Sequence, residues 1–222
     1  MTPGSFVDAL ADIKLPNVFN PYADKCEVYD RSDAPRRRRS NLQAFIQAAA
    51  NVGVDSIWIG RDLGYRGGRR TGVPLTDEVH LGAAATYFSS LAFSRATKGP
   101  IVAERTAAIV WKVLVQLNRP VFLWNVFPLH PHLDGDNFSN RCHTRHEREV
   151  FRPLLTELLS MLSVRHVIAI GRDAQSGLAD LGVIASPVRH PSYGGQAEFI
   201  AGIFAHYDTP STKGWPSIGR AK

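Results

Sequence analysis

The chain has 222 residues, 44% of them hydrophobic, so it can bury a full core without disulfide bonds or structural metals. Lysine and arginine outnumber aspartate and glutamate by 26 to 20, which gives a formal net charge of +6 and a pI near 9.6. This basic balance favours a polyanionic partner such as nucleic acid, and no apolar run approaches the roughly twenty residues that a membrane span needs.

The cysteines indicate the compartment. Cys26 and Cys142 lie far apart and show no CxxC spacing, which argues against a disulfide framework and for a reducing compartment. Two thiols are also too few for an iron-sulfur cluster, which needs about four. The N-terminus lacks the basic and then apolar order of a signal peptide. We therefore expect a soluble cytoplasmic protein without a metal or cofactor, folded as one domain over residues 1–222 with a frayed tail at 209–222.

The first part of the chain predicts two helices with a long loop between them. Apolar spacing predicts a helix over residues 6–15, and turn-forming residues follow at 17–35. The four arginines at 36–39 precede Ser40, a suitable N-cap for a helix over 41–51. We interpret the arginines as a solvated turn, with phosphate contact as the alternative.

The rest of the chain alternates between strands and helices. Short runs rich in β-branched and aromatic residues predict strands at 54–59, 121–126, 167–170 and 183–185. Helical spacing predicts helices at 79–93, 101–117, 144–162, 174–181 and 198–206. Strands separated by helices predict a parallel sheet covered on both faces, here an α/β fold with a three-layer α/β/α sandwich around a four-stranded parallel sheet.

The first of these strands ends at Gly60 and opens into a loop rich in glycine and arginine. Glycines here allow the backbone to approach a ligand closely. Cationic donors for an anionic ligand are supplied by Arg66, Arg69 and Arg70. Asp62 is the only carboxylate before Asp77, so one acid stands alone in basic surroundings at the carboxyl end of a strand, where parallel sheets bind ligands.

A second strand exit carries a histidine on a stiff turn, in the sequence RHPSYGG at 189–195. Together with GRDLG, GVPLTDE and WNVFPL, this stretch resembles the motifs of the uracil-DNA glycosylase superfamily. The resemblance runs in order from about Asn20 to His206, which is most of the chain. Each motif is short, but the ordered set is specific.

The resemblance implies two catalytic residues. Asp62 matches the aspartate of the family motif GQDPYH, and it would face the cationic sugar and hold the attacking water. His190 matches the histidine of the family motif HPS, where a neutral imidazole donates to uracil O2. Considered alone, Asp62 could equally cap a turn, and an isolated histidine at a strand end is more often structural.

The resemblance also implies a base-binding pocket. Asn125 matches the asparagine of the LLLN motif, which lies against the Watson–Crick edge of uracil and rejects cytosine; the alternative is an asparagine that ties two loops together. Leu75 stands where the best-known branch stacks a phenylalanine, with Phe127 as another candidate, and Gly64 stands where that branch has a tyrosine that blocks thymine. The predicted substrate-binding residues are Gly60, Gly64, Tyr65, Leu75 and Asn125.

Phosphate contacts are expected from both strand exits, because hydroxyls, backbone N–H groups and arginines suit phosphate oxygens. The predicted DNA-binding residues are Arg66, Arg69, Arg70, Arg189, Pro191, Ser192 and Tyr193. Tyr193 takes the place of the leucine that the best-known branch inserts into the duplex, so it could act as a wedge, or single-stranded DNA could be preferred. Residues 171–175 could add a phosphate contact.

These features predict a monofunctional uracil-DNA glycosylase of base excision repair, a monomer that binds single- or double-stranded DNA without metal. The alternative from another class is a non-catalytic binder of single-stranded or damaged DNA on the same fold. A third hypothesis comes from His130, His132, Asp134 and Asp136, which could ligate a divalent metal. All four lie on one short loop, so we interpret that loop as a polar surface loop.

Overall fold

The computed structural model describes residues 1–88 and 91–208. Its central sheet has four parallel strands in the order β3-β2-β5-β6. These strands are β2 (Ser56–Asp62), β3 (Phe122–Phe127), β5 (His166–Ile170) and β6 (Ser186–Val188). A small antiparallel pair joins β1 (Val18–Phe19) to β4 (His130–Pro131). The predicted four-stranded parallel sheet is therefore confirmed.

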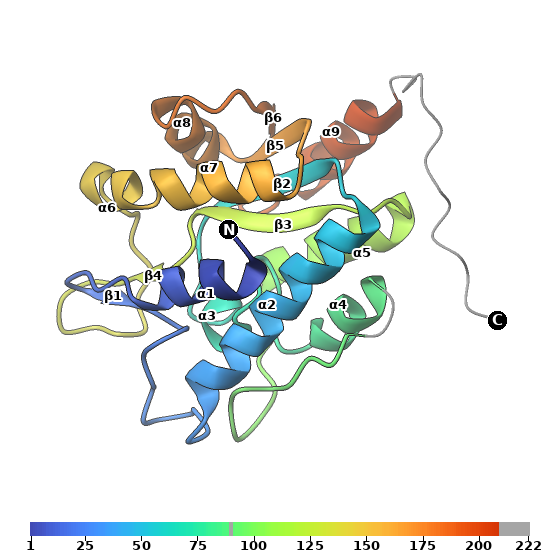
Figure 1. The fold of residues 1–222 in the computed structure, drawn as a ribbon. Helices are drawn as coiled ribbons and strands as arrows, with labels where there is room; N and C mark the ends of the chain where they lie inside the picture. The colour runs from blue at the N-terminus through green and yellow to red at the C-terminus, as the bar shows by residue number, and fades with distance from the viewer. Residues whose placement is uncertain (89–90, 209–222) are drawn as a thin grey trace.

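Helices cover both faces of the sheet. In Figure 1, α7 and α8 lie on one side of the strands, and α2 and α5 lie on the other. The helices are α1 (Pro3–Ala11), α2 (Ala34–Val52), α3 (Gly68–Thr71), α4 (Leu81–Tyr87), α5 (Arg105–Leu117), α6 (Arg145–Val150), α7 (Arg152–Met161), α8 (Arg172–Asp180) and α9 (Gln196–Asp208). The core between these layers is strongly aromatic: Trp58 packs edge-on against Phe199 of α9, and Phe45 of α2 packs against Phe122 of β3. The three-layer α/β/α arrangement matches the prediction.

The arginine run at 36–39 is not the solvated turn that its charge suggested. It lies inside α2, which begins at Ala34 with Pro35 in its first turn, where a proline is tolerated. Arg38 is completely buried, because it pairs with Asp30 and donates to backbone carbonyls, including Arg70 O. Ser40 is therefore a residue of the helix interior and does not cap it.

Several other elements differ from their predicted bounds. The helix expected over 6–15 is α1, which begins at Pro3 and ends at Ala11, and the helix expected over 79–93 is α4, which ends at Tyr87. The helix expected over 144–162 is interrupted at Phe151, and α7 restarts with Pro153 in its first turn. The strand expected at 183–185 forms three residues later as β6, because Ser186 and Val188 are the residues in register with β5. The expected tail at 209–222 lies outside the described residues. None of the described helices is long and apolar enough to span a membrane.

Candidate active site

Parallel pairing brings the predicted site residues to one edge of the sheet. Gly60 of β2 is in register with Asn125 of β3, and Asp62 is in register with Phe127. The other two strands lie beyond β2 in the strand order. β5 ends one residue before Gly171, and β6 ends at Val188, two residues before His190. The carboxyl ends of all four strands thus meet where an open α/β sheet binds its ligand.

The Asp62 carboxylate is held on both of its oxygens. Oδ2 accepts from Nε of Arg61, and Oδ1 contacts Nδ1 of His143. The side chain is only 6% exposed. Each carboxylate oxygen can accept more than one hydrogen bond, so the pairing fixes the carboxylate without using all of its acceptor capacity.

His143 is a site residue that the sequence did not predict. Its ring stacks on Phe127 at 5.4 Å, and Nη1 of Arg148 lies 3.4 Å from Nε2. Arginine can only donate, so Nε2 accepts and the hydrogen-bond pattern assigns the ring proton to Nδ1, which donates to Asp62. His143 lies in a loop immediately before Thr144, whose capping box starts α6. That cap was the only nearby sequence signal, and it points to a helix start and not to a ligand.

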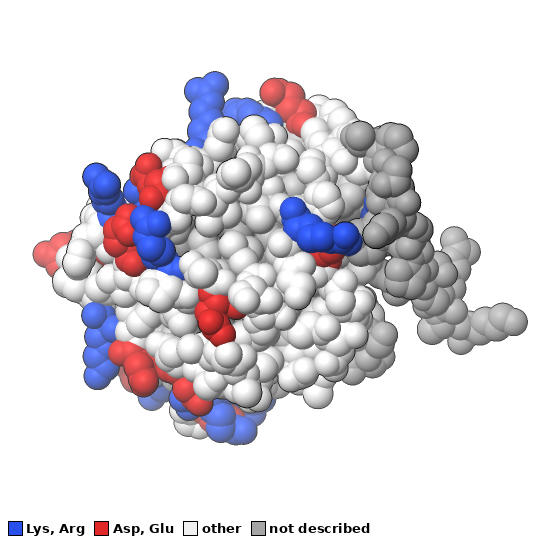
Figure 2. Space-filling model, turned by 45° about the horizontal axis from the view of Figure 1, so that its top comes forward, with Lys and Arg blue, Asp and Glu red and all other residues white. Residues whose placement is uncertain are grey.

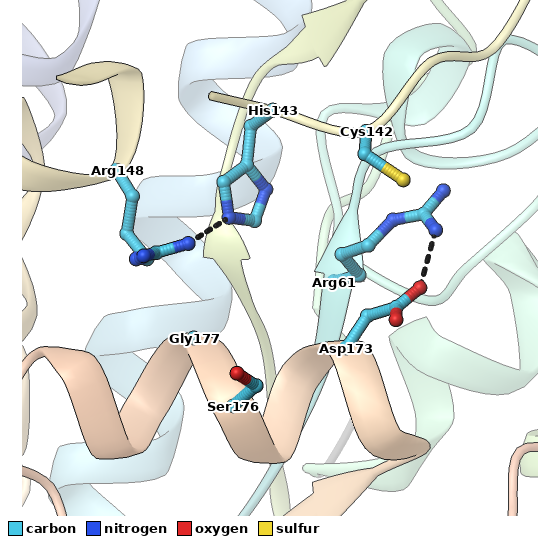
Figure 3. A pocket seen from close by; sticks show the side chains of 7 residues that line it. All are labelled: Arg61, Cys142, His143, Arg148, Asp173, Ser176 and Gly177. Carbon is cyan, nitrogen blue, oxygen red and sulfur yellow. Dashed lines mark hydrogen bonds and ion pairs between the residues drawn. The ribbon is translucent and has the colours of Figure 1, made fainter. Parts of the chain in front are cut away.

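Arg61 connects Asp62 to α8. Its Nη1 donates to Oδ2 of Asp173 at 2.7 Å (Figure 3). Burial opposes its charge, but Asp62 and Asp173 outweigh burial and raise the pKa of Arg61, so it stays cationic. A pocket of about 190 Å³ lies beside these groups, lined by Arg61, Cys142, His143, Arg148, Asp173, Ser176 and Gly177.

Asn125 presents a buried acceptor that has no partner. Its Nδ2 donates to the backbone oxygen of Asp62 at 3.0 Å, which fixes the amide orientation because a carbonyl only accepts. Its Oδ1 is buried and has no hydrogen-bond partner among the described residues. A Cβ at Gly60 would come within 2.8 Å of Nδ2, so the glycine is needed to make room for the amide. An unsatisfied buried acceptor costs about 1–3 kcal/mol, a cost that a ligand donor would remove.

Leu75 completes this part of the site. Its Cδ2 lies 3.0 Å from the position that a Cβ at Gly60 would occupy. Its φ of 54° is in the left-handed region, which a bulky side chain rarely adopts. Such strain is often found where a side chain is held against a ligand. The predicted Gly60, Leu75 and Asn125 therefore lie together.

The hydrogen bonds of His190 leave its Nε2–H available to donate a hydrogen bond. Its Nδ1 accepts from the backbone N–H of Ser192 at 3.2 Å and lies 2.5 Å from Oγ of the same serine. In the neutral ring the proton is therefore on Nε2. Burial lowers the pKa of His190, and the nearby charges of Arg61 and Arg189 lower it further, so the ring is neutral at pH 7. Arg61 thus contacts Asp62, and its charge also acts on His190.

The turn around His190 depends on small residues. A Cβ at Gly195 would lie 2.2 Å from the carbonyl oxygen of His190, and a Cβ at Gly171 would lie 3.0 Å from His190 Cβ. Beyond the histidine, Pro191 is buried and Ser192 is partly buried, whereas Arg189 is exposed. Tyr193 is 94% exposed and has a φ of 52°. The turn thus projects a large aromatic ring into solvent next to His190.

Arg69 and Arg70, predicted to contact DNA, lie inside the protein, and we no longer expect them to reach phosphates. Arg69 is 1% exposed, with its guanidinium 3.9 Å from the Phe19 ring centroid. Arg70 is 6% exposed and pairs with Glu78 at 3.0 Å. The physical reason is pairing: buried acceptors and aromatic faces compensate for the desolvation of each guanidinium.

Arg66 alone of the three loop arginines is exposed. Its Nε donates to the hydroxyl of Tyr65 at 2.9 Å. The Tyr65 ring lies 6.3 Å from Phe138, and Oδ1 of Asn140 accepts from the Tyr65 N–H at 3.2 Å. These contacts make an aromatic and cationic surface beside the loop that follows Asp62. On the face shown in Figure 2, acidic and basic side chains are interspersed and form no continuous basic stripe.

The histidine loop has a structural role at His130. Its Nδ1 accepts from Arg69 at 2.9 Å, and its Nε2 donates to Ser139 O at 2.9 Å, so neither nitrogen has a lone pair left for a metal. Burial, followed by the charge of Arg69, lowers the pKa of His130 to about 3. Among the described residues, no group of three or more His, Cys, Asp or Glu side chains could hold a metal ion.

Comparisons with known proteins agree with the predicted family and fold. The family model of the uracil DNA glycosylase superfamily matches residues 51–202. Among solved structures, wild-type SMUG2 from Pedobacter heparinus superposes with a TM-score of 0.63 at 13% sequence identity, over 93% of this chain and 97% of that chain, which shows a shared fold. A search of the curated proteins found no match. The chain belongs to the uracil DNA glycosylase superfamily, a superfamily of DNA glycosylases.

Proposed function

We propose that the protein is a monofunctional uracil DNA glycosylase of base excision repair, acting in the cytoplasm as a monomer. It extrudes a uracil nucleotide from DNA and hydrolyses the N-glycosidic bond to leave an abasic site. The observation that carries the proposal is the unpaired, buried Oδ1 of Asn125 at the strand edge that also holds Asp62 and His190.

The geometry of Asn125 suits uracil and not cytosine. A uracil ring has an N3–H donor, which can satisfy the buried Oδ1, and an O4 acceptor for the remaining Nδ2 hydrogen. Cytosine presents an acceptor at N3 and an amino group at C4, so both contacts would be mismatched. Leu75, held beside Gly60 and Asn125, supplies an apolar surface for the face of the base.

The chemistry divides between two residues. When the bond between C1′ and N1 breaks, its electron pair leaves with the base, and Nε2–H of His190 donates to O2 of the departing anion. The sugar becomes cationic, and the Asp62 carboxylate stabilises it and accepts a hydrogen bond from the water that adds to C1′. The proton that this water loses balances the one that the base anion takes up as it becomes neutral uracil. Arg61 and His143 keep the carboxylate in place. None of the described residues that we assign to the site is a lysine, so no Schiff base and no strand cleavage are expected.

DNA contacts come from both sides of the site. On one side, Ser192, the backbone after Pro191 and exposed Arg189 suit phosphates, and Tyr193 can fill the space left by the extruded base. On the other side, Tyr65 and Arg66 offer a stacking surface and a cation.

The direct test is uracil release from a labelled oligonucleotide in the presence of a chelator. The wild type should release uracil and leave cytosine untouched. Asn125→Ala should lower the rate about 10- to 100-fold, because a buried hydrogen bond is worth about 1–3 kcal/mol. Asn51→Ala, at an exposed position on α2, serves as the control. A wild-type rate in Asn125→Ala would contradict the role assigned to Asn125. Loss of wild-type activity in the chelator would instead support the hypothesis of a metal site in the histidine loop.

One observation favours a second candidate, a non-catalytic binder of single-stranded or damaged DNA. Both oxygens of Asp62 are already engaged, and the side chain is nearly buried. The ion pair with Arg61 offsets part of the negative charge that a cationic sugar would need. Tight binding of a uracil-containing oligonucleotide without base release would decide for this candidate.

A further inference from the structure

Glu104 is a partly buried acid that the proposed mechanism does not use. It immediately precedes α5, and its backbone N–H donates to Oδ2 of Asp77 at 2.6 Å. Its carboxyl lies against the loop that follows Asp62. A Cβ at Gly64 would be 2.7 Å from Oε1, and a Cβ at Gly67 would be 1.8 Å from Oε2. Both glycines are therefore required for the carboxyl to occupy this place.

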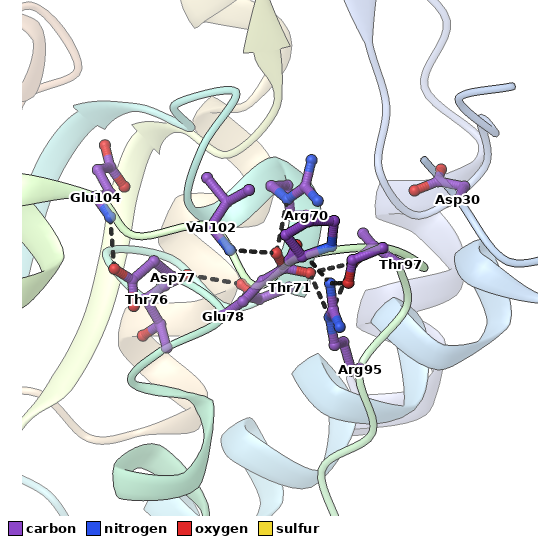
Figure 4. A network of polar contacts seen from close by, with 12 residues as sticks. Asp30, Arg70, Thr71, Thr76, Asp77, Glu78, Arg95, Thr97, Val102 and Glu104 are labelled. Atoms are coloured by element: carbon purple, nitrogen blue, oxygen red, sulfur yellow. Dashed lines mark hydrogen bonds and ion pairs between the residues drawn. The ribbon is translucent and has the colours of Figure 1, made fainter. Parts of the chain in front are cut away.

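The neighbouring acids are all paired, and Glu104 is not. Glu78 accepts from Arg70, Arg95, Thr97 and the Val102 N–H, and Oδ1 of Asp77 contacts His80. Figure 4 shows the Glu104 carboxyl pointing away from this network. Among the described residues, neither of its oxygens accepts a hydrogen bond. A partly buried carboxyl that accepts no hydrogen bond from the protein is available to a ligand.

Its position ties it to the base-binding residues. The side chains of Leu75 and Asn125 occupy the space where a Cβ at Gly60 would lie. Leu75 lies two residues before Asp77. Asp77 in turn fixes the backbone of Glu104. Gly64, over which the carboxyl lies, comes two residues after Asp62. Glu104 therefore lies between the two segments, with its backbone against the one that carries Leu75 and its carboxyl against the one that carries Asp62.

Its surroundings keep the carboxyl neutral to a higher pH than usual. Burial raises the pKa of Glu104 to about 7, the charge of Asp77 also raises it, and Arg66 opposes them. Of the charged and titratable groups packed near it, Asp77 comes from the loop before α4 and is paired with His80, and Arg66 comes from the glycine loop.

We infer that Glu104 forms a wall of the base-binding pocket and controls base release through its charge, a role that rests on the proposed function. The base leaves as an anion, so a carboxylate beside it opposes release, whereas a neutral carboxyl can donate a hydrogen bond to a base carbonyl. Release should therefore be fast while Glu104 is protonated and should slow as the carboxyl ionises. The substrate class is a base with a carbonyl oxygen directed at Glu104.

The test is the pH dependence of single-turnover uracil release in the wild type and in Glu104→Gln. The wild-type rate should fall by up to about 10-fold per pH unit above pH 7. Glutamine keeps the shape of the side chain and cannot ionise, so that variant should keep its rate up to pH 9. Glu27→Gln, at an exposed position, should behave as the wild type. Asp77→Asn should move the falling limb to lower pH, because it removes a charge that raises the pKa of Glu104.

The outcomes separate the two proposals. A wild type that releases no uracil at any pH overturns the proposed function, and the role of Glu104 with it. Uracil release with the same falling limb in the wild type and in Glu104→Gln overturns only the role of Glu104. If circular dichroism shows that Glu104→Gln does not fold, Asp77→Asn provides the test. A fall in the rate of uracil release that begins at lower pH than in the wild type supports the inference, and a fall at the same pH overturns it.

Discussion

The two loops that bracket the site use similar residues in opposite ways. The loop after β2, residues 63–78, turns Arg69 and Arg70 inward and leaves only Arg66 exposed. The turn after β6, residues 189–195, exposes Arg189 and Tyr193 and buries Pro191. Glycines have different tasks in each: in the first they make room for side chains from other segments, and in the second they let the backbone close around His190.

This difference shows what decides the fate of a cation in a glycine-rich loop. An arginine is buried where the fold brings a buried acceptor or an aromatic face to it, as Glu78 does for Arg70. Arg66 contacts the hydroxyl and the ring of the partly exposed Tyr65, and it stays at the surface. The first loop is thus mainly a scaffold, and the second exposes the groups that we propose to contact DNA.

The largest expected effect concerns acid stability of the scaffold loop. The pKa of His130 is lowered to about 3, so the unfolded chain binds a proton there below about pH 6.5 and the folded chain does not. The free energy of unfolding should therefore fall as the pH drops from about 6.5 to about 3, by about 5 kcal/mol in total. Urea unfolding at several pH values in the wild type and in His130→Asn measures this. Equal slopes between pH 6.5 and 5 would contradict the assignment.

Removing a buried arginine of the loop after β2 should lower the free energy of unfolding nearly as much. Arg70→Ala leaves Glu78 buried with one ion-pair partner fewer, and the free energy of unfolding should drop by about 3 kcal/mol. Urea unfolding at pH 7 provides the measurement. A loss of DNA affinity with unchanged stability would place Arg70 on the DNA surface and break the comparison.

A change in the turn at residues 189–195 should lower the rate of uracil release. In Gly195→Ala the new Cβ would lie 2.2 Å from His190 O, so the turn must shift and the imidazole with it. A misplacement of about 1 Å can cost about 100-fold in rate, which single-turnover uracil release would detect. Gly194→Ala is the matched control, since nothing lies within 4 Å of its Cβ, although its φ of 79° adds strain. Equal rates in the two variants would contradict the claim that uracil release depends on the exact position of the His190 imidazole.

The smallest effect is expected at the surface arginine. Arg66→Ala should change the free energy of unfolding by no more than about 0.5 kcal/mol. It should weaken binding to a single-stranded oligonucleotide and lower the slope of log affinity against log salt by about 1. Fluorescence anisotropy at several salt concentrations measures both. An unchanged slope would show that Arg66 makes no phosphate contact.

Much of the fold could be predicted from local pattern. The buried runs that became β2, β3 and β5 are short, apolar and rich in β-branched and aromatic residues, and they were placed within a few residues. β6 was placed three residues early, because its register is set by pairing with β5 and not by hydropathy: exposed Ile184 looked like strand, whereas Pro187 lies within it.

Sequence motifs could point to candidate site residues only where they mark a strand end. Asp62, Asn125 and His190 stand at such ends and lie at one edge of the sheet. His143 and Glu104 act through contacts with segments 81 and 40 residues away, counted to Asp62 and Gly64, and no local pattern encodes these contacts. For the same reason the sequence could not show that Arg69 and Arg70 find partners in the interior.

A double-mutant cycle in single-turnover uracil release tests most directly whether Asp62 and His190 act on one extruded base. Asp62→Asn and His190→Ala should each lower the rate by about 100-fold or more. The two changes together should cost less than the product of the single losses, because both groups stabilise the same transition state. Wild-type rates in both single variants would contradict the proposed mechanism.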